Sequence, residues 1–393
     1  MATDLGSFFT QAGLSVTVSD PLVAASRLEV STITETLSSY SHQMRATGGF
    51  YAASIASFIG LGEANDWISR GVGRHIEVMS PGLSTVWEGF VNKLTINLGR
   101  AKIVIGPLVS IGNKVKVAYS TVDTSTSPPT VGKRDTTAWI ENSFSQAEHG
   151  VWQKVASISG SNATEALQVA NTWLVEHAWP ESGRRATLRA GSEPQVSLDC
   201  LGYWAWLEAY IYNQTASSGN IDLDDKIVAV LAADPNGIFS SDYTRIAANT
   251  TQISQYENKD KRAWTILKDL ASKGDSQYRR YTLGVYEGRR LVYQLAPNAI
   301  ELKTSLTENE EWSTLQQQRV EPWLVRPDSW VFLGDIQVGT ALPATSAKLR
   351  SDVRAGFIES LKFSAPRDLE VDGQKVSHLD QQLARMGLAG AGV

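Results

Sequence analysis

Apolar and polar side chains alternate along residues 75–119, and turn residues divide this alternation into successive runs. In the central run, Leu94, Ile96 and Leu98 fall on one side of an extended chain, while polar side chains occupy the other side. A period of two across turns is typical of half-buried antiparallel strands. The pattern therefore predicts an antiparallel sheet, and no residue in it indicates a catalytic role.

Shorter alternating segments predict more strands on both sides of this region. Residues 13–60 have the pattern of a strand, a connection and further strand. The segment 281–294 has a central glutamate–glycine pair between two alternating runs, which predicts a β-hairpin. Residues 330–338 are predicted to form another β region.

Helical spacing of apolar residues interrupts the strand pattern. Asn162 with Glu165 forms a capping pair, and Gly274 follows a last-turn lysine as a C-terminal signal. The aromatic segment 203–212 favours a helix, whereas the Ser-, Thr-, Pro- and Gly-rich segment 121–137 is predicted to be a loop or linker. The predicted helices cover 162–178, 222–233, 263–273 and 376–386.

Composition narrows the class of protein. A chain of 393 residues with 42% hydrophobic and 20% charged residues is long enough for two or three folded domains. The net charge of −5 and the absence of clustered Lys and Arg argue against nucleic-acid binding through a basic face. No signal peptide or membrane span is predicted, and a single cysteine, Cys200, is consistent with folding in a reducing cytoplasm.

The residue types that usually carry chemistry are scattered. The histidines at positions 42, 75, 149, 177 and 378 include no pair at metal-ligand spacing. We expect His75 to be a surface or interface residue, and Cys200, beside two leucines, to be a buried inert thiol. No dinucleotide fingerprint, phosphate loop or serine-nucleophile elbow is present. We therefore predict no catalytic, cofactor-binding or metal-binding residues.

Acidic pairs and tryptophans leave one enzymatic alternative open. Asp224-Asp225 and the acidic run 308–311 provide paired carboxylates, and twelve tryptophans could provide sugar platforms. The first pair, however, lies in a predicted first helical turn, where the helix dipole favours negative charge, and the second lies in a polar run. For each tryptophan, we favour a place in the core over a subunit interface; seven lie at the edges of predicted elements: Trp67, Trp87, Trp139, Trp152, Trp312, Trp323 and Trp330.

Short motifs of glycines, aromatic residues and strand patterns recur in a distinctive order between residues 28 and 335. These motifs are Gly48-Gly49-Phe50, Trp87-Glu88-Gly89-Phe90-Val91, Gly106-Pro107-Leu108, the segment 113–119, the segment 198–203, the segment 284–293 and the segment 325–330. With this arrangement, the chain resembles the baseplate hub, or tail hub, family of long-tailed bacteriophages.

The resemblance implies an α+β fold with two tail-tube-like antiparallel β-barrel domains and inserted helical or mixed segments. The implied divisions are a first barrel at 1–120, a mixed region at 121–275, strands of the second barrel at 276–345, and a C-terminal strand, helix and flexible tail at 346–393. Such hubs are trimers whose ring joins the tail tube to the tail tip and passes the genome. The implied partners are further copies of the chain, the tail tube protein, the tip or spike protein, the tape measure protein and other baseplate proteins.

The expected role is therefore that of a non-enzymatic virion protein, assembled in the host cytoplasm. Two alternatives stay open at this point: a distal-tail or other peripheral baseplate subunit, and a carbohydrate-binding or carbohydrate-cleaving tail protein.

Overall fold

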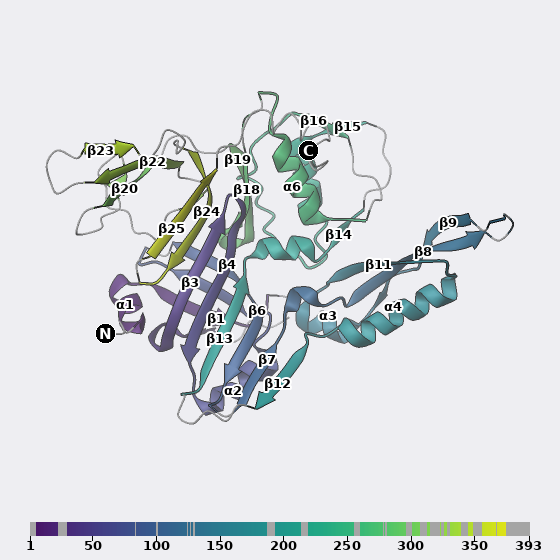
Figure 1. Cartoon of the computed structure of the whole chain (residues 1–393), viewed down its shortest axis with the longest axis horizontal. Helices are drawn as coiled ribbons and strands as arrows, with labels where there is room; N and C mark the ends of the chain where they lie inside the picture. Colours follow the sequence, from purple (N-terminus) through teal and green to yellow (C-terminus); the bar gives the residue numbers. More distant parts are fainter. Residues whose placement is uncertain are drawn as a thin grey trace.

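A computed structural model shows an α+β protein in which one large sheet forms the body and a smaller sheet projects from it as an arm (Figure 1). The structure describes residues 5–22, 30–82, 84–99, 101–123, 125, 127–128, 130–186, 193–213, 219–254, 260–277, 279, 281–295, 301–306, 313–314, 323, 326–327, 331–338, 345–348, 356–366 and 368–374.

Antiparallel pairing builds the body from strands that lie far apart in sequence. Its central strands are β3 (Leu37–Arg45), β4 (Thr47–Phe58), β13 (Gln195–Leu201) and β6 (Thr85–Asn97), in this spatial order. Beyond β6 lie β7 (Ala101–Ile105), β12 (Ser182–Ala186), β5 (His75–Met79), β1 (Ser15–Ser19) and β2 (Val30–Thr32).

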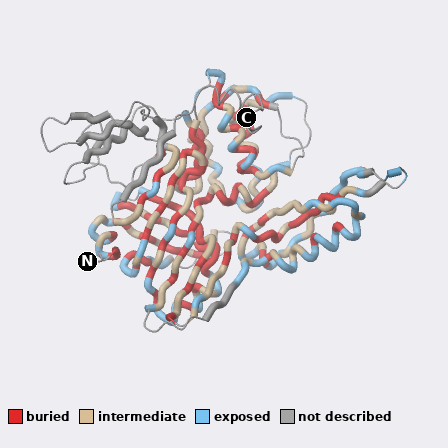
Figure 2. The backbone as a smooth tube through the Cα atoms, viewed as in Figure 1, coloured by how far each residue is buried: buried red, intermediate tan, exposed pale blue. Residues whose placement is uncertain are grey.

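The strands predicted from residues 75–119 are confirmed as β5, β6, β7 and the start of β8 (Lys114–Asp123), although β8 belongs to the smaller sheet. Burial alternates, as predicted, in β5 and in the second half of β6. Leu94 and Ile96 are fully buried, whereas the residues between and beside them are half-exposed. Figure 2 shows the resulting alternation of buried and partly exposed positions along the strands of the body. One face of the sheet therefore packs on the core and the other face meets solvent.

The core side of the body is covered by helix α1 (Leu5–Ala12), the 3-10 turn η1 (Thr34–Thr36) and neighbouring strands. Phe9 of α1 is fully buried, and its ring lies 5.2 Å from the ring of Tyr40 in an edge-on arrangement. Helix α2 (Leu61–Arg70) packs near β6, with Trp67 buried. The strand pairings of the described residues close no barrel, so the predicted pair of barrel domains is not confirmed.

The hairpin predicted at 281–294 is confirmed by the antiparallel strands β18 (Tyr281–Tyr286) and β19 (Arg290–Leu295), joined by η4 (Glu287–Arg289). Strand β18 also runs parallel to the start of β4, where Gly284 pairs with Gly48. The hairpin therefore joins the body sheet at a glycine-rich crossing.

The arm contains β8 (Lys114–Asp123), β9 (Thr130–Thr136), β10 (Ile140–Glu141), β11 (Gln153–Ser159), α3 (Ser143–His149) and α4 (Ala163–His177). Helix α4 packs on β8 through Ala166 and Ala170, which with nearby strand residues form a second, small core. The capping pair of α4 is confirmed, because Asn162 accepts from the backbone N–H of Glu165 at 3.0 Å. The loop predicted at 121–137 is wrong in part, because β9 pairs with β8 there.

The remaining helices cover the body beside the β18–β19 hairpin. The helices predicted at 222–233 and 263–273 are confirmed as α5 (Leu223–Ala232) and α6 (Ala263–Lys273). The helix favoured at 203–212 is only partly right, because a 3-10 helix, η3 (Tyr203–Glu208), gives way to a strand. Short strands complete this region: β14 (Ile211–Tyr212), β15 (Asn220–Asp222), β16 (Gln252–Ser254) and β17 (Lys261–Arg262).

The C-terminal strands extend the body sheet from β3. Strand β24 (Gly356–Ser364) pairs antiparallel with β3, and the β region predicted at 330–338 is present as β22 (Val331–Val338). The helix predicted at 376–386 lies outside the described residues, and the predicted division into four segments stays a prediction. The C-terminal strands are β20 (Glu301–Leu306), β21 (Ser313–Thr314), β22 (Val331–Val338), β23 (Thr345–Lys348), β24 (Gly356–Ser364) and β25 (Asp368–Gln374).

Candidate functional site

The solvent-facing side of the four central strands of the body carries mostly short polar side chains, and we call it the sheet face. Strand register places its residues in rows that cross four strands. One row is Ser39, Ala56, Ser197 and Thr95, and a second is Ser41, Ser54, Asp199 and Lys93.

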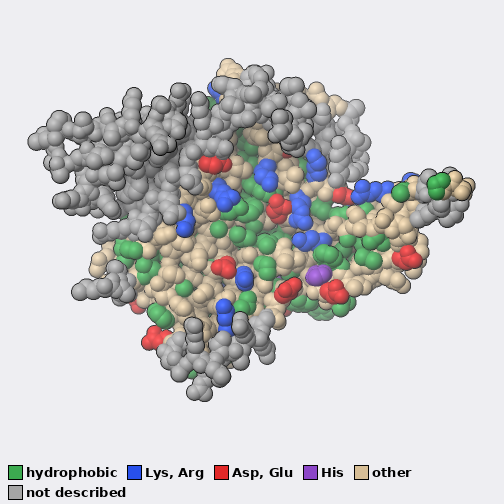
Figure 3. Space-filling view, in the orientation of Figure 1, with side chains coloured by type: hydrophobic (Ala, Val, Ile, Leu, Met, Phe, Trp, Pro, Cys, Tyr) green, Lys and Arg blue, Asp and Glu red, His purple; other side chains and the backbone are tan. Residues whose placement is uncertain are grey.

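Two charges in the sheet face oppose each other directly. Asp199 of β13 and Lys93 of β6 are register partners, so their charges offset across neighbouring strands. The other residues of the two rows are hydroxyl or methyl side chains. Figure 3 shows that uncharged polar atoms and backbone predominate over this part of the body, with isolated charged side chains.

Beneath the sheet face, the alternate residues of the same strands pack into the core. Ile55, Leu198 and Ile96 are fully buried on β4, β13 and β6. Since a packed interior deforms little, the core behind the sheet face holds it rigid. The arrangement can present a smooth surface, but it brings together no acid, base and nucleophile.

The buried thiol and imidazole behind the sheet face are both uncharged at physiological pH. Cys200 is 2% exposed, and burial raises the pKa of its thiol far above the ordinary value, which confirms the predicted inert thiol. His42 is also buried, and burial lowers its pKa to about 3, so the ring is neutral at physiological pH. Its Nδ1 atom lies 2.9 Å from the hydroxyl oxygen of Tyr40.

Other residues singled out from the sequence lie apart from the sheet face. His75 is half-buried on β5, with Nδ1 2.7 Å from the hydroxyl oxygen of Tyr203. Asp224 and Asp225 lie in the first turn of α5, as predicted, and the acidic run 308–311 falls outside the described residues. Within the described part of the chain, no three His, Cys, Asp or Glu side chains gather closely enough to hold a metal ion.

The core placement favoured for tryptophan holds at several positions. Of the seven at element edges, Trp67, Trp87, Trp152 and Trp323 are buried, and Trp139 is half-buried. The other two fall outside the described residues. Across the described segments, no helix has the length and apolar character needed to cross a membrane.

A buried carboxylate that sequence reasoning missed joins β6 to the hairpin turn. Glu88, 3% exposed, accepts from the backbone N–H of Gly288 at 2.6 Å and lies 3.4 Å from the guanidinium of Arg289. Burial raises the pKa of Glu88 from 4.5 to about 7, although both partners oppose the shift. Its position within an otherwise apolar strand segment, Val86 to Val91, is the signal that could have identified it.

The raised pKa of Glu88 should make the stability of the protein depend on pH. Between pH 4.5 and 7, folded Glu88 holds a proton that the unfolded chain releases, so stability falls as pH rises through this window. The raised pKa of Glu88 corresponds to a change of about 3 kcal/mol in the free energy of unfolding across this window. Glu88→Gln, neutral at every pH, should flatten the dependence measured by urea unfolding at pH 5 and pH 8. A control, Glu176→Gln on the exposed side of α4, should keep the wild-type slope, and an equal slope in both variants would contradict the assignment.

Comparisons with known proteins give two solved structures that align along most of the chain. A tail protein from Neisseria meningitidis MC58 aligns at 9% identity and a TM-score of 0.34, covering 94% of this chain and 99% of that one. The 43 kDa tail protein of prophage MuSo2 from Shewanella oneidensis aligns at 9% identity and a TM-score of 0.34, covering 93% and 99%. No protein-family model and no curated protein matches the sequence.

Proposed function

We propose that this chain is a structural protein of a bacteriophage tail, and specifically the baseplate hub whose ring joins the tail tube to the tail tip or spike. The observation that carries the proposal is the sheet face. A broad, rigid and nearly uncharged wall suits a passage better than it suits a binding pocket.

Physical chemistry supports this use of the sheet face. A polyanion such as DNA is held by clustered Lys and Arg, and each neutralised phosphate adds to its affinity. In the two rows that cross the sheet face, the one lysine, Lys93, is offset by Asp199. Short hydroxyl and methyl side chains offer few flexible groups that could grip a moving strand. The genome could therefore pass along such a wall without being retained.

Three of the motifs behind the family resemblance lie together in the fold, which also supports the proposal. Gly48 and Gly49 of the first motif pair with Gly284 and Val285 of a later one, where β4 meets β18. Glu88 of a third motif contacts the η4 turn of the same hairpin. These three motifs therefore build one structural junction.

In this proposal the chain forms a homotrimer within the virion tail and baseplate. The ring contacts the tail tube protein on one side and the tip or spike protein on the other. The tape measure protein and other baseplate proteins are further partners. Assembly takes place in the host cytoplasm, and no step of the proposed role requires an enzyme.

The oligomeric state tests the proposal. Purified protein should give a particle of about 128 kDa by light scattering, which is three times the chain mass of 42.8 kDa. Electron microscopy should show a three-fold ring with the sheet face at its central opening. A protein that stays monomeric at micromolar concentration, alone and with tail tube protein, would overturn the hub assignment. A ring with the sheet face on its outside would overturn the role given to that face.

A further inference from the structure

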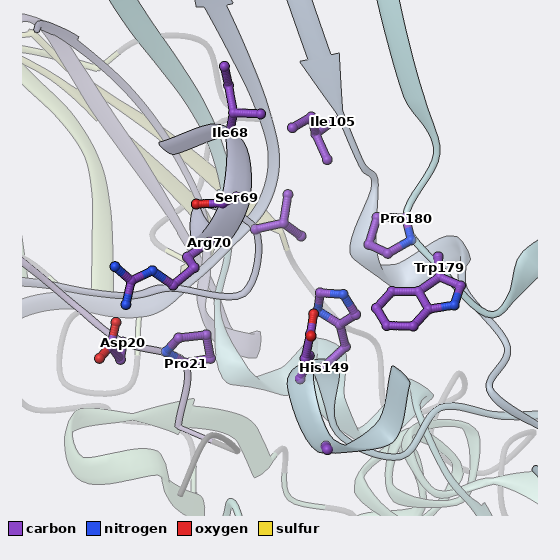
Figure 4. A pocket seen from close by; sticks show the side chains of 12 residues that line it. Asp20, Pro21, Ile68, Ser69, Arg70, Ile105, His149, Trp179 and Pro180 are labelled. Atoms are coloured by element: carbon purple, nitrogen blue, oxygen red, sulfur yellow. The ribbon is translucent and has the colours of Figure 1, made fainter. Parts of the chain in front are cut away.

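A pocket of about 440 Å³ lies between the body and the base of the arm (Figure 4). Asp20, Pro21 and Arg70 lie on one side of it, and His149 and Trp179 lie on the other. Its volume is within the range of roughly 300–1,000 Å³ that is usual for small-molecule sites. The pocket is separate from the sheet face and takes no part in the proposed function.

Asp20 gives the pocket a carboxylate that can accept hydrogen bonds from a ligand. The residue is 8% exposed, yet no described residue donates a hydrogen bond to its side chain or pairs with its charge. A carboxylate at the wall of a pocket can accept hydrogen bonds from water, or from the hydroxyl groups of a ligand that takes the place of that water. The nearest basic side chain of the lining, Arg70, is instead paired with Asp66 at 3.0 Å.

His149 adds a second polar atom without a partner. Its Nδ1 is buried and has no hydrogen-bond partner, while its ring packs edge-on against Trp179 with 5.6 Å between centroids. Burial lowers the pKa of His149 to about 4, so the ring is neutral near pH 7. The imidazole therefore adds no charge to the pocket.

Trp179 provides an apolar wall that is still open to solvent. Its side chain is 40% exposed, unlike the buried tryptophans of the core. Pro180 and Pro21 continue this wall on either side, together with Ile68, Val72 and Ile105. An exposed indole in the same lining as an unpaired carboxylate suits a ligand that has both an apolar face and hydroxyl donors.

Charge narrows the class of ligand. Asp20 and Glu148 disfavour an anion such as a phosphate, and the guanidinium of Arg70 in the same lining disfavours a cation. From this geometry we infer that the pocket is a binding site for a neutral sugar, whose C–H face packs on Trp179 and whose hydroxyls donate to Asp20. The site binds its ligand, and nothing in its geometry cleaves it.

Titration calorimetry with the full-length protein tests this inference. The probes are glucose, galactose, mannose, N-acetylglucosamine and their common disaccharides, each at up to 20 mM, a range chosen for weak single-site binding on the order of millimolar Kd. At least one should bind at one site per chain. Trp179→Ala and Asp20→Asn should each weaken that binding by about tenfold or more.

Phe144→Ala is the matched control, because Phe144 is an equally apolar side chain on α3, 80% exposed and outside the pocket lining. It should bind as the wild type does, and unchanged thermal unfolding of all three variants excludes a folding defect. Absence of binding to every sugar, or binding that Trp179→Ala leaves unchanged, overturns the inference. So does competition by free arginine or inorganic phosphate at equal concentration, which would assign the pocket to a charged ligand. The particle mass measured for the hub proposal is independent of all these outcomes.

Discussion

Gly49→Ala is expected to lower the free energy of unfolding by roughly 3–5 kcal/mol, the range of severe backbone and packing defects. Gly49 has a φ of +74°, a conformation that L side chains rarely adopt. An added Cβ would also lie 2.4 Å from the carbonyl oxygen and 2.6 Å from the nitrogen of Val285. These neighbours are backbone atoms of β18, so they cannot move aside without breaking the strand pairing.

Urea unfolding measures this effect, and Gly62→Ala is its control. Gly62 lies in α2, and an added Cβ there would meet no atom within 4 Å. The control should be unchanged or more stable by about 0.5–1 kcal/mol, because alanine favours helix more than glycine does. Similar unfolding midpoints for the two variants would show that the close approach of β4 and β18 does not limit stability.

Asn113→Ala should lower the free energy of unfolding by roughly 3 kcal/mol, because it removes three hydrogen bonds made by a fully buried side chain. Its Nδ2 donates to the hydroxyl of Ser145 at 3.1 Å and to the carbonyl of Gly150 at 2.7 Å. Its Oδ1 accepts from the backbone N–H of Trp152 at 2.8 Å. The substitution would leave the carbonyl of Gly150 and the N–H of Trp152 unpaired in the interior, where α3 joins the arm to the body, whereas Ser145 would keep its hydrogen bond to Ala178.

Thermal and urea unfolding check this expectation against Asn171→Ala. Asn171 lies on the exposed side of α4 and donates only to the carbonyl of Leu167, at 3.0 Å. Surface changes of this kind usually stay within about 0.5 kcal/mol. A loss at Asn113 no larger than that at Asn171 would refute the role given to the buried amide.

Local signals in the sequence predicted most individual elements. Alternation identified β5, β6 and β7, and the caps at Asn162 and Gly274 located the ends of α4 and α6. These signals depend only on residues close together in the sequence, so they can be read without knowing the tertiary structure. Strand β9 escaped detection because its residues 131 and 133–136 are exposed on both faces, which removes the alternation.

Strand order and register could not be predicted in the same way. The sheet face depends on Ser197 lying between Ala56 and Thr95, and these residues come from three distant segments. Glu88 and Asp20 are similar cases, because burial by distant residues decides their behaviour. The period of two predicted which side chains share a face of one strand, but it carried no information on the neighbouring strands.

The place of β13 also constrains the order of folding during synthesis. Strands β4 and β6 both pair with β13, which leaves the ribosome about one hundred residues after β6 is complete. Until then, β4 and β6 each have an unpaired edge, and such edges can pair with other chains. The growing polypeptide therefore depends on rapid arrival of its middle section, or on a chaperone that shields the gap.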